Sequence, residues 1–339
     1  LPPTKKAVGV DNRNVYDLST LPGRTNFPVD IPLRSNGSSP YSGIYLLSNN
    51  DGEKGYSYNL TVSIDKAFAN GWALNANYSY GSSVVINEGT SSQNSSQWQF
   101  METVNGRNFI TRSNSDFDPG HRINAYVSKK ISYLNNKLAT TISLVYNGQS
   151  GNTFSYIMNR GMVRDADNFE TNDLIYVPTT AELASMVFLP NTVGSGSSSV
   201  TYTPDEQRAF FNDYIENDKY LKKTRGQYAE RNGARLPFTN VLDLKLQQDF
   251  NVKIGAKTYQ LQLSYDIFNF TNFINRDWGK LYFLTNDQLN IIDFTGYISA
   301  TDLTPQFKFT PSSSKRYNIS DGVYNSSRWT SQLGIRLNF

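Results

Sequence analysis

Apolar and polar side chains alternate over residues 56–68 of the chain. The apolar positions of this stretch are Tyr56, Tyr58, Leu60, Val62 and Ile64, and mostly polar side chains separate them. A period of two residues places successive side chains on opposite faces of a β-strand. The alternation resumes over residues 72–80 after a short turn. Together the two stretches predict a β-hairpin.

The hairpin pattern recurs twice, and a single alternating stretch ends the chain. The second hairpin covers residues 121–133 and 138–146, and the third covers residues 242–250 and 259–267. The final stretch spans residues 329–339. The hydrophobic pattern therefore predicts seven antiparallel strands.

The connections between these strands have two very different lengths. Polar segments at about 82–120, 148–237 and 270–327 separate the hairpins, whereas the turns inside the hairpins take only a few residues. Transmembrane β-barrels have short periplasmic turns on one rim and long external loops on the other. We therefore expect an all-β fold, a transmembrane antiparallel β-barrel with long extracellular loops. Residues 1–55 are expected to be an extracellular loop segment, and residues 56–339 are expected to carry the barrel strands.

Seven strands are too few to close a bacterial barrel, which needs at least eight and usually an even number. The remaining strands are expected to come from a missing amino-terminal part of the same protein or from another chain. The sequence leaves open which of these sources applies. It also leaves the oligomeric state open.

The alternation divides each strand into an apolar face, which is expected to contact lipid, and a polar face, which is expected to line the lumen. The candidates for the lumen are Asn75, Asn77, Ser143, Gln260, Gln262, Asp266 and Arg336. Amphipathic rings near strand ends are expected at the membrane interface. These rings are Trp72, Tyr80, Tyr146, Tyr259 and Trp329.

Lys66 and Lys129 have the lipid-facing register but lie near the short turns. Their aliphatic stems can lie on lipid there while the ammonium groups reach water. The alternative is that they are ordinary solvent-facing lysines on a soluble sheet.

Composition narrows the possible chemistry. The formal charge is +3, which is too weak to select a nucleic acid, and the absence of cysteine excludes disulfides and thiolate metal sites. His121 is the single histidine, and no Gly-x-Ser-x-Gly motif accompanies it. We therefore predict no enzymatic activity, no catalytic residue, no organic cofactor and no nucleic-acid partner.

Residues 165–173 concentrate oxygen-bearing side chains. The candidate ligands for a calcium ion are Asp165, Asp167, Glu170 and Asp173, although their spacing departs from the EF-hand pattern. The alternative is a solvated acidic loop.

Thr203, Pro204 and Glu206 have the spacing of a helix start, with a capping hydroxyl, a proline at the first helical position and a glutamate at the third. The apolar residues that follow at helical spacing are Phe210, Phe211, Tyr214, Ile215 and Leu221. We expect an amphipathic helix that packs onto the core of its own loop, because its polar face mixes both charge signs.

Several segments resemble a known family. The final strand, with Trp329, Leu333, Ile335, Leu337 and Phe339, is similar to the terminal signal that the barrel-assembly machinery recognises. Residues 117–122, 172–178, 242–246 and 266–272 together resemble TonB-dependent outer-membrane transporters of the Oar-like branch, which carry a carboxypeptidase-regulatory-like domain.

The resemblance begins at about residue 40 and implies that the chain forms about the last seven strands of a 22-stranded barrel. It also implies an outer-membrane location in a Gram-negative bacterium, with outer-membrane lipid, the TonB system and the barrel-assembly machinery as partners. The plug and the TonB-contacting segment belong to the missing part.

The function predicted on this basis is transport or reception of an unidentified ligand, with this chain forming part of the barrel wall and the outer loops that approach the ligand. Two alternatives stay open. One is a soluble or surface β-sandwich that binds glycans or peptides, and the other is a structural barrel subunit of a larger outer-membrane complex.

Overall fold

The computed structural model describes residues 5–16, 52–89, 91–106, 109–163, 171–255, 257–311, 317–319 and 327–338. In this part of the chain one antiparallel sheet contains seven long strands in the order β21-β16-β15-β7-β6-β4-β3. They are β3 (Tyr56–Ala69), β4 (Trp72–Val85), β6 (Gly120–Tyr133), β7 (Leu138–Gln149), β15 (Thr239–Ile254), β16 (Lys257–Phe268) and β21 (Thr330–Asn338). The seven strands predicted from the alternation are all present, and each pairs with its neighbours in sequence order.

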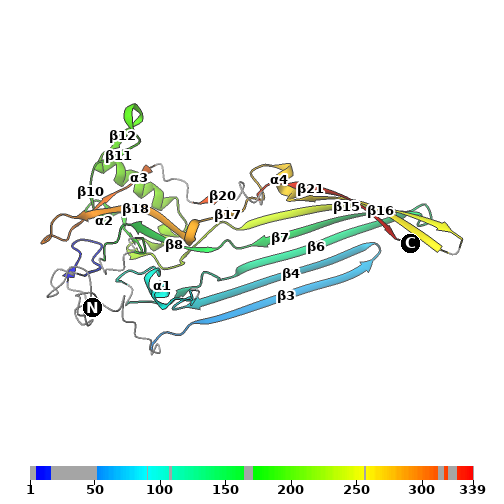
Figure 1. The fold of residues 1–339 in the computed structure, drawn as a ribbon, viewed down its shortest axis with the longest axis horizontal. Coiled ribbons are helices and arrows are strands. Elements are labelled where there is room, and N and C mark those ends of the chain that lie inside the picture. The colour runs from blue at the N-terminus through cyan, green and yellow to red at the C-terminus, as the bar shows by residue number, and fades with distance from the viewer. Residues whose placement is uncertain are drawn as a thin grey trace, which may run out of the picture.

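The short turns of the hairpins lie at one end of the sheet, and the long connections lie at the other (Figure 1). Between β3 and β4 the turn uses Asn70 and Gly71, whose φ values of 53° and 77° suit a tight hairpin turn. A Cβ on Gly71 would lie 2.2 Å from the carbonyl oxygen of Lys130, so the neighbouring strand also requires glycine there. Among the described residues, no helix is long and apolar enough to cross a membrane.

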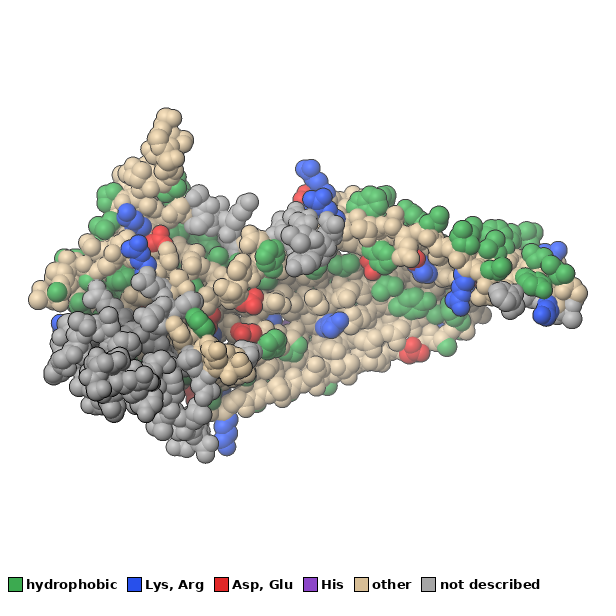
Figure 2. Space-filling view, in the orientation of Figure 1, with side chains coloured by type: hydrophobic (Ala, Val, Ile, Leu, Met, Phe, Trp, Pro, Cys, Tyr) green, Lys and Arg blue, Asp and Glu red, His purple; other side chains and the backbone are tan. Residues whose placement is uncertain are grey.

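The long sheet exposes its apolar face to the surroundings, whereas a soluble protein would bury that face. On the polar face Ser128, Ser143 and Asp249 are buried, whereas on the apolar face Leu60 and Ile335 are 64% and 72% exposed. Register places Leu74, Val127, Leu144 and their partners side by side, so the apolar face is continuous across strands. Hydrophobic side chains gather along the β15, β16 and β21 border in Figure 2, and mainly polar surface covers the middle strands. A sheet with an exposed apolar face and a polar face that is buried in part suits a barrel wall in lipid.

A second body, here called the outer module, lies at the long-loop end of the sheet (Figure 1). Its five-stranded sheet has the order β10-β19-β18-β8-β14 among the described residues. The bounds are β8 (Thr153–Asn159), β10 (Val187–Phe188), β14 (Ala234–Arg235), β18 (Gln288–Tyr297) and β19 (Pro305–Lys308). Strands β18 and β8 pair in parallel although more than 130 residues separate them.

The described part of the chain has seven helical segments. They are α1 (Asn94–Gln99), α2 (Thr180–Leu183), α3 (Pro204–Glu216), α4 (Phe270–Ile274), η2 (Gly196–Ser198), η3 (Leu221–Thr224) and η4 (Thr285–Asp287). Of these, α4 contacts β15 of the long sheet and α3 contacts β10 of the five-stranded sheet. Short strand pairs complete the described elements. They are β1 (Lys5–Lys6) with β2 (Asn14–Val15), β9 (Tyr176–Val177) with β13 (Gln227–Tyr228), β11 (Asn191–Val193) with β12 (Val200–Tyr202), β17 (Tyr282–Phe283) with β20 (Asn318–Ile319), and β5 (Ser113–Asn114) with β4.

The outer module has a hydrophobic core of its own. Its buried aromatic residues are Phe154, Tyr156, Phe188, Phe211, Tyr214, Phe294, Phe307 and Phe309. The predicted helix is confirmed as α3, which begins with a capping box between Thr203 and Glu206 and buries Phe211 and Ile215 in this core. The long segments that the sequence presents as polar connections therefore include a packed unit. Strand β8 is buried at six consecutive positions, so it lacks the alternation that marks the long strands.

Residues 5–16 also belong to the outer module. Ala7 and Val15 lie in its core, and Arg13 is fully enclosed, with Nη2 donating to Asp11 at 2.9 Å and to the carbonyl of Leu174 at 2.7 Å. Burial alone would lower the pKa of Arg13, but Asp11 and Asp173 reverse the effect and raise the pKa. Residues 1–55 were predicted to be a loop, but residues 5–16 pack as a strand pair on the outer module. Residues 17–51 lie outside the described residues.

Candidate ligand-binding site

A pocket of about 440 Å³ opens at the long-loop end of β4, between the connection that follows this strand and the outer module. Its described lining residues come from three parts of the sequence. They are Asn87, Glu88, Ser91, Ser96, Gln97, Phe100, Met101, Glu102, Asp116, Arg231, Asn286 and Gln288. The volume lies in the range of small-molecule sites, roughly 300 to 1,000 Å³.

Arg231 is held from behind by the end of the long sheet. Its Nε donates to Ser113 Oγ at 2.6 Å, and its Nη2 donates to the carbonyl of Ile86 at 2.8 Å. The residue is 5% exposed, and burial lowers its pKa. These acceptors are neutral, and no carboxylate lies within 4.0 Å of the guanidinium among the described residues. The charge of Arg231 therefore interacts at longer range with the carboxylates of the pocket.

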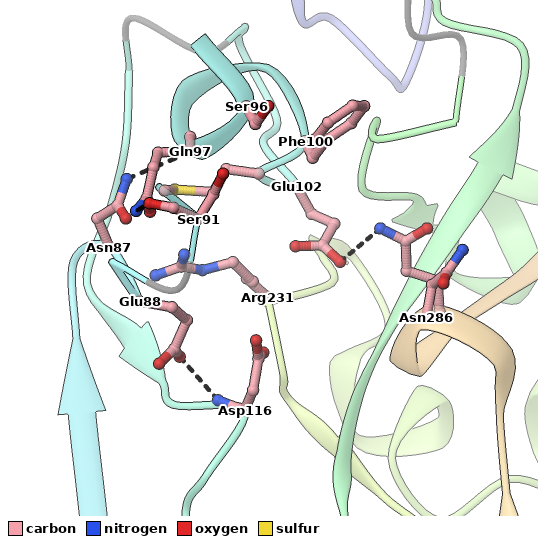
Figure 3. A pocket seen from close by; sticks show the side chains of 12 residues that line it. Asn87, Glu88, Ser91, Ser96, Gln97, Phe100, Glu102, Asp116, Arg231 and Asn286 are labelled. Carbon is pink, nitrogen blue, oxygen red and sulfur yellow. Dashed lines mark hydrogen bonds between the residues drawn. The ribbon is translucent and has the colours of Figure 1, made fainter. Parts of the chain in front are cut away.

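Three carboxylates surround the same space (Figure 3). Glu88 accepts hydrogen bonds from Ser115 Oγ at 3.0 Å and from the backbone N–H of Asp116 at 2.7 Å, and it therefore holds the turn before β6. Asp116 accepts from Asn232 Nδ2 at 2.6 Å.

Glu102 is the deepest of the three carboxylates and faces the outer module. Its Oε1 accepts a 2.7 Å hydrogen bond from Nε2 of Gln288, the first residue of β18. Burial raises the pKa of Glu102, and the Gln288 hydrogen bond opposes that effect. The contact joins the two walls of the pocket, because Glu102 belongs to the connection after β4 and Gln288 to the module sheet.

The predicted lumen residues share one face of the long sheet. Register places all seven on the polar face, where hydrogen bonds join them to neighbours. Asp266 pairs with Lys245 at 2.9 Å, Ser143 bonds Ser128 at 2.9 Å, and Gln262 donates to Asp249 at 2.7 Å. The other contacts are Asn75 with Asp65 and Asn77, and Asn338 with Gln260 and Arg336. That this face lines a lumen stays a prediction.

The five predicted interface aromatics lie near strand ends in the apolar register. Trp72 and Tyr259 lie at the short-turn end, and Tyr80, Tyr146 and Trp329 lie at the other. Trp72 and Trp329 are 50% and 43% exposed, and Trp329 packs edge-on against Phe273 with ring centroids 5.0 Å apart.

The final strand forms one border of the long sheet. Within the described residues β21 pairs only with β16, and at the opposite border β3 pairs only with β4. The apolar side chains of the predicted assembly signal project from one face, with Leu333 and Ile335 more than 70% exposed. Phe339 lies outside the described residues.

Of the four candidate calcium ligands the structure describes only Asp173, because Asp165, Asp167 and Glu170 lie outside the described residues, and calcium binding stays a prediction. Asp173 Oδ2 accepts the backbone N–H groups of Met162 and Val163 at 2.6 and 3.0 Å and lies 3.7 Å from Arg13 Nη1. Asp173 therefore has a structural role at this buried ion pair.

His121 contacts two tyrosines of β4 near the start of β6. Its Nδ1 is 2.8 Å from Tyr78 Oη, and its ring lies against Tyr80. Sequence reasoning had not singled out Arg231, Glu88, Glu102 or Asp116. No local motif marks them, since they meet only when the connection after β4 packs on the outer module.

A family model described as an outer membrane beta barrel domain matches residues 8–277. The chain belongs to this family. The match includes six of the seven long strands described, the helix α3 and the anchored segment around Arg13. No curated protein and no solved structure matches the chain.

Membership in the outer membrane β-barrel family agrees with the inverted polarity of the long sheet. The chain is a protein of the outer membrane, with an exposed apolar face for lipid and a polar face on the opposite side. A soluble β-sandwich would bury its apolar face instead, so that alternative does not fit. In this family member the outer module stands at the long-loop rim, where the pocket lies.

Proposed function

We propose that this chain is the closing part of a TonB-dependent transporter or receptor, in which the outer module captures a ligand and the polar sheet face lines its path. The observation that carries the proposal is the charged pocket between Glu102 and Arg231, at the rim of a barrel wall. A purely structural wall has no need of a concave site of this size with charged side chains at the rim.

The proposal includes partners that complete the assembly. Further strands, a plug and a TonB-contacting segment would be supplied by polypeptide besides the seven strands described here, since seven strands do not close a barrel. The chain has no chemical step in this scheme and acts by binding and by shaping the pathway. The resemblance of residues 117–122 and 266–272 to Oar-like transporters supports this choice.

The test compares nutrient depletion by living cells. The gene for this protein would be deleted in its source bacterium, and the removal of peptides and glycans from a defined medium would be followed by mass spectrometry. We expect one class of compound to remain in the medium, and loss of TonB should leave the same class behind. Equal depletion by all strains, combined with altered outer-membrane integrity in the deletion strain, would favour a structural subunit instead.

A further inference from the structure

We infer that the pocket of the outer module selects a ligand group that carries a positive charge and donates hydrogen bonds, namely an alkylammonium or guanidinium. The inference rests on the proposed function and names the chemical class of its ligand. The observation that carries it is the convergence of Glu88, Glu102 and Asp116 on a cavity that has Arg231 as its single cation among the described lining residues.

The described lining of the pocket has a negative formal charge. Three carboxylates against one guanidinium leave the described lining with a net charge of −2. Nε and Nη2 of Arg231 donate to Ser113 and to backbone carbonyls, and no described carboxylate lies within 4.0 Å of the guanidinium. An anionic ligand would meet three carboxylates and a guanidinium that is already bonded from behind.

Hydrogen-bond capacity points the same way. An ionised carboxylate offers about four acceptor positions, and the side-chain amides of Gln288 and Asn232 use one position each on Glu102 and Asp116. The pocket therefore has more acceptors than donors. Ammonium and guanidinium groups are donors only, so they complement such a lining better than hydroxyl groups, which bring as many acceptors as donors.

The apolar part of the wall fits the same ligand class. Phe100 is 47% exposed at the pocket, and Met101 beside it is buried. An aromatic face attracts a cation, and the aliphatic stem of a lysine or arginine side chain can lie along such a surface. The volume of about 440 Å³ accommodates a side chain with flanking groups, which is far more than a bare metal ion needs.

The experiment measures binding by calorimetry to the whole protein extracted from its outer membrane in detergent. The probes are N-acetyl-Ala-Lys-Ala-amide, its neutral glutamine counterpart, and spermidine as a cation without peptide bonds. We expect the lysine peptide to bind at least about tenfold more tightly than the glutamine peptide, as suits a charge-assisted hydrogen bond. Binding by spermidine alone would keep the cationic class and show that the peptide backbone does not fit.

Variants localise the binding to the pocket. Glu102→Gln should weaken lysine-peptide binding by about tenfold, whereas Glu230→Gln, which removes an exposed carboxylate next to Arg231 but outside the pocket, should change it by less than about twofold. Asp116→Asn is a second pocket variant if Glu102→Gln fails to fold.

Equal binding of the lysine and glutamine peptides, or no binding of either cation, would overturn the inference. Binding without uptake by cells would contradict the transport proposal alone, and uptake of a neutral or anionic compound would contradict the ligand class alone.

Discussion

Lys129 and Trp72 meet on the apolar face of the long sheet, where the Lys129 Nζ lies 4.8 Å from the centre of the Trp72 ring. The same Nζ donates a 2.8 Å hydrogen bond to the carbonyl of Asn70 in the turn between β3 and β4. The ammonium thus leaves the apolar face and reaches the end of the sheet. This geometry marks the short-turn end as the level at which lipid gives way to water.

The position of Lys129 predicts that the cost of a charged residue on the apolar face rises with its depth in the membrane. Leu144→Lys would place a cation on the same face nearer the middle of β7, and we expect a loss of about 2–4 kcal/mol in the free energy of unfolding. Asn147→Lys, on the polar face of the same strand, is the control and should cost less than about 1 kcal/mol. Denaturant titration of the protein in lipid vesicles measures both values. A similar cost for the two variants would mean that the apolar face does not contact lipid.

The buried Arg13 predicts a strong dependence of the outer module on residues 5–16. Arg13→Met would leave Asp11 and Asp173 as buried carboxylates without their cation, and this should destabilise the module by about 3–5 kcal/mol. The measurement is thermal unfolding followed by limited proteolysis of the module. Arg276→Met removes an exposed arginine and should have little effect. If both variants melt together with the unmodified protein, the Arg13 contacts do not anchor the segment.

These contacts show where sequence reasoning succeeds and where it stops. Alternation located β3 and β4 within a few residues, because each strand is long and keeps one face mostly apolar. Helix α3 was found because Thr203 and Glu206 form a local capping motif. Both signals depend only on residues close together in sequence.

The outer module and its pocket depend on partners far apart in sequence. Strand β8 pairs with β18, and Arg13 reaches the carbonyl of Leu174, 161 residues away. Glu102 and Gln288 are 186 residues apart. Neither residue has a neighbour in sequence that distinguishes it from an ordinary surface residue, so only the packed structure brings them together.

The final strand predicts a face-specific effect on assembly. Ile335→Asn places an amide on the exposed apolar face of β21, and we expect less folded protein in the outer membrane, by at least about half, because this face is expected to contact both lipid and the assembly machinery. Gln332→Asn, on the polar face, should leave the level unchanged. The amount of folded protein can be read from its heat-modifiable migration in gels. Equal levels for the two variants would remove the proposed role of the apolar face.

Burial of Glu102 predicts how the stability of the outer module depends on pH. The pKa of Glu102 is raised above its value in an unfolded chain. Between the two values the folded state holds a proton that the unfolded state has released, so this group adds stability as pH falls and removes stability as pH rises through the folded pKa.

Glu102→Gln removes this titration while keeping an oxygen acceptor for Gln288. We expect the variant to melt at a higher temperature than the unmodified protein at neutral pH, and the difference should shrink as the pH falls toward the unfolded value of about 4.3. Melting curves from about pH 4 to pH 8 measure the difference, with Glu230→Gln as the control for losing an exposed carboxylate. The same protonation should weaken binding of the lysine peptide at low pH in the unmodified protein and not in the variant. A melting difference that stays constant across this range would show that the Glu102 carboxylate does not carry a buried charge at neutral pH.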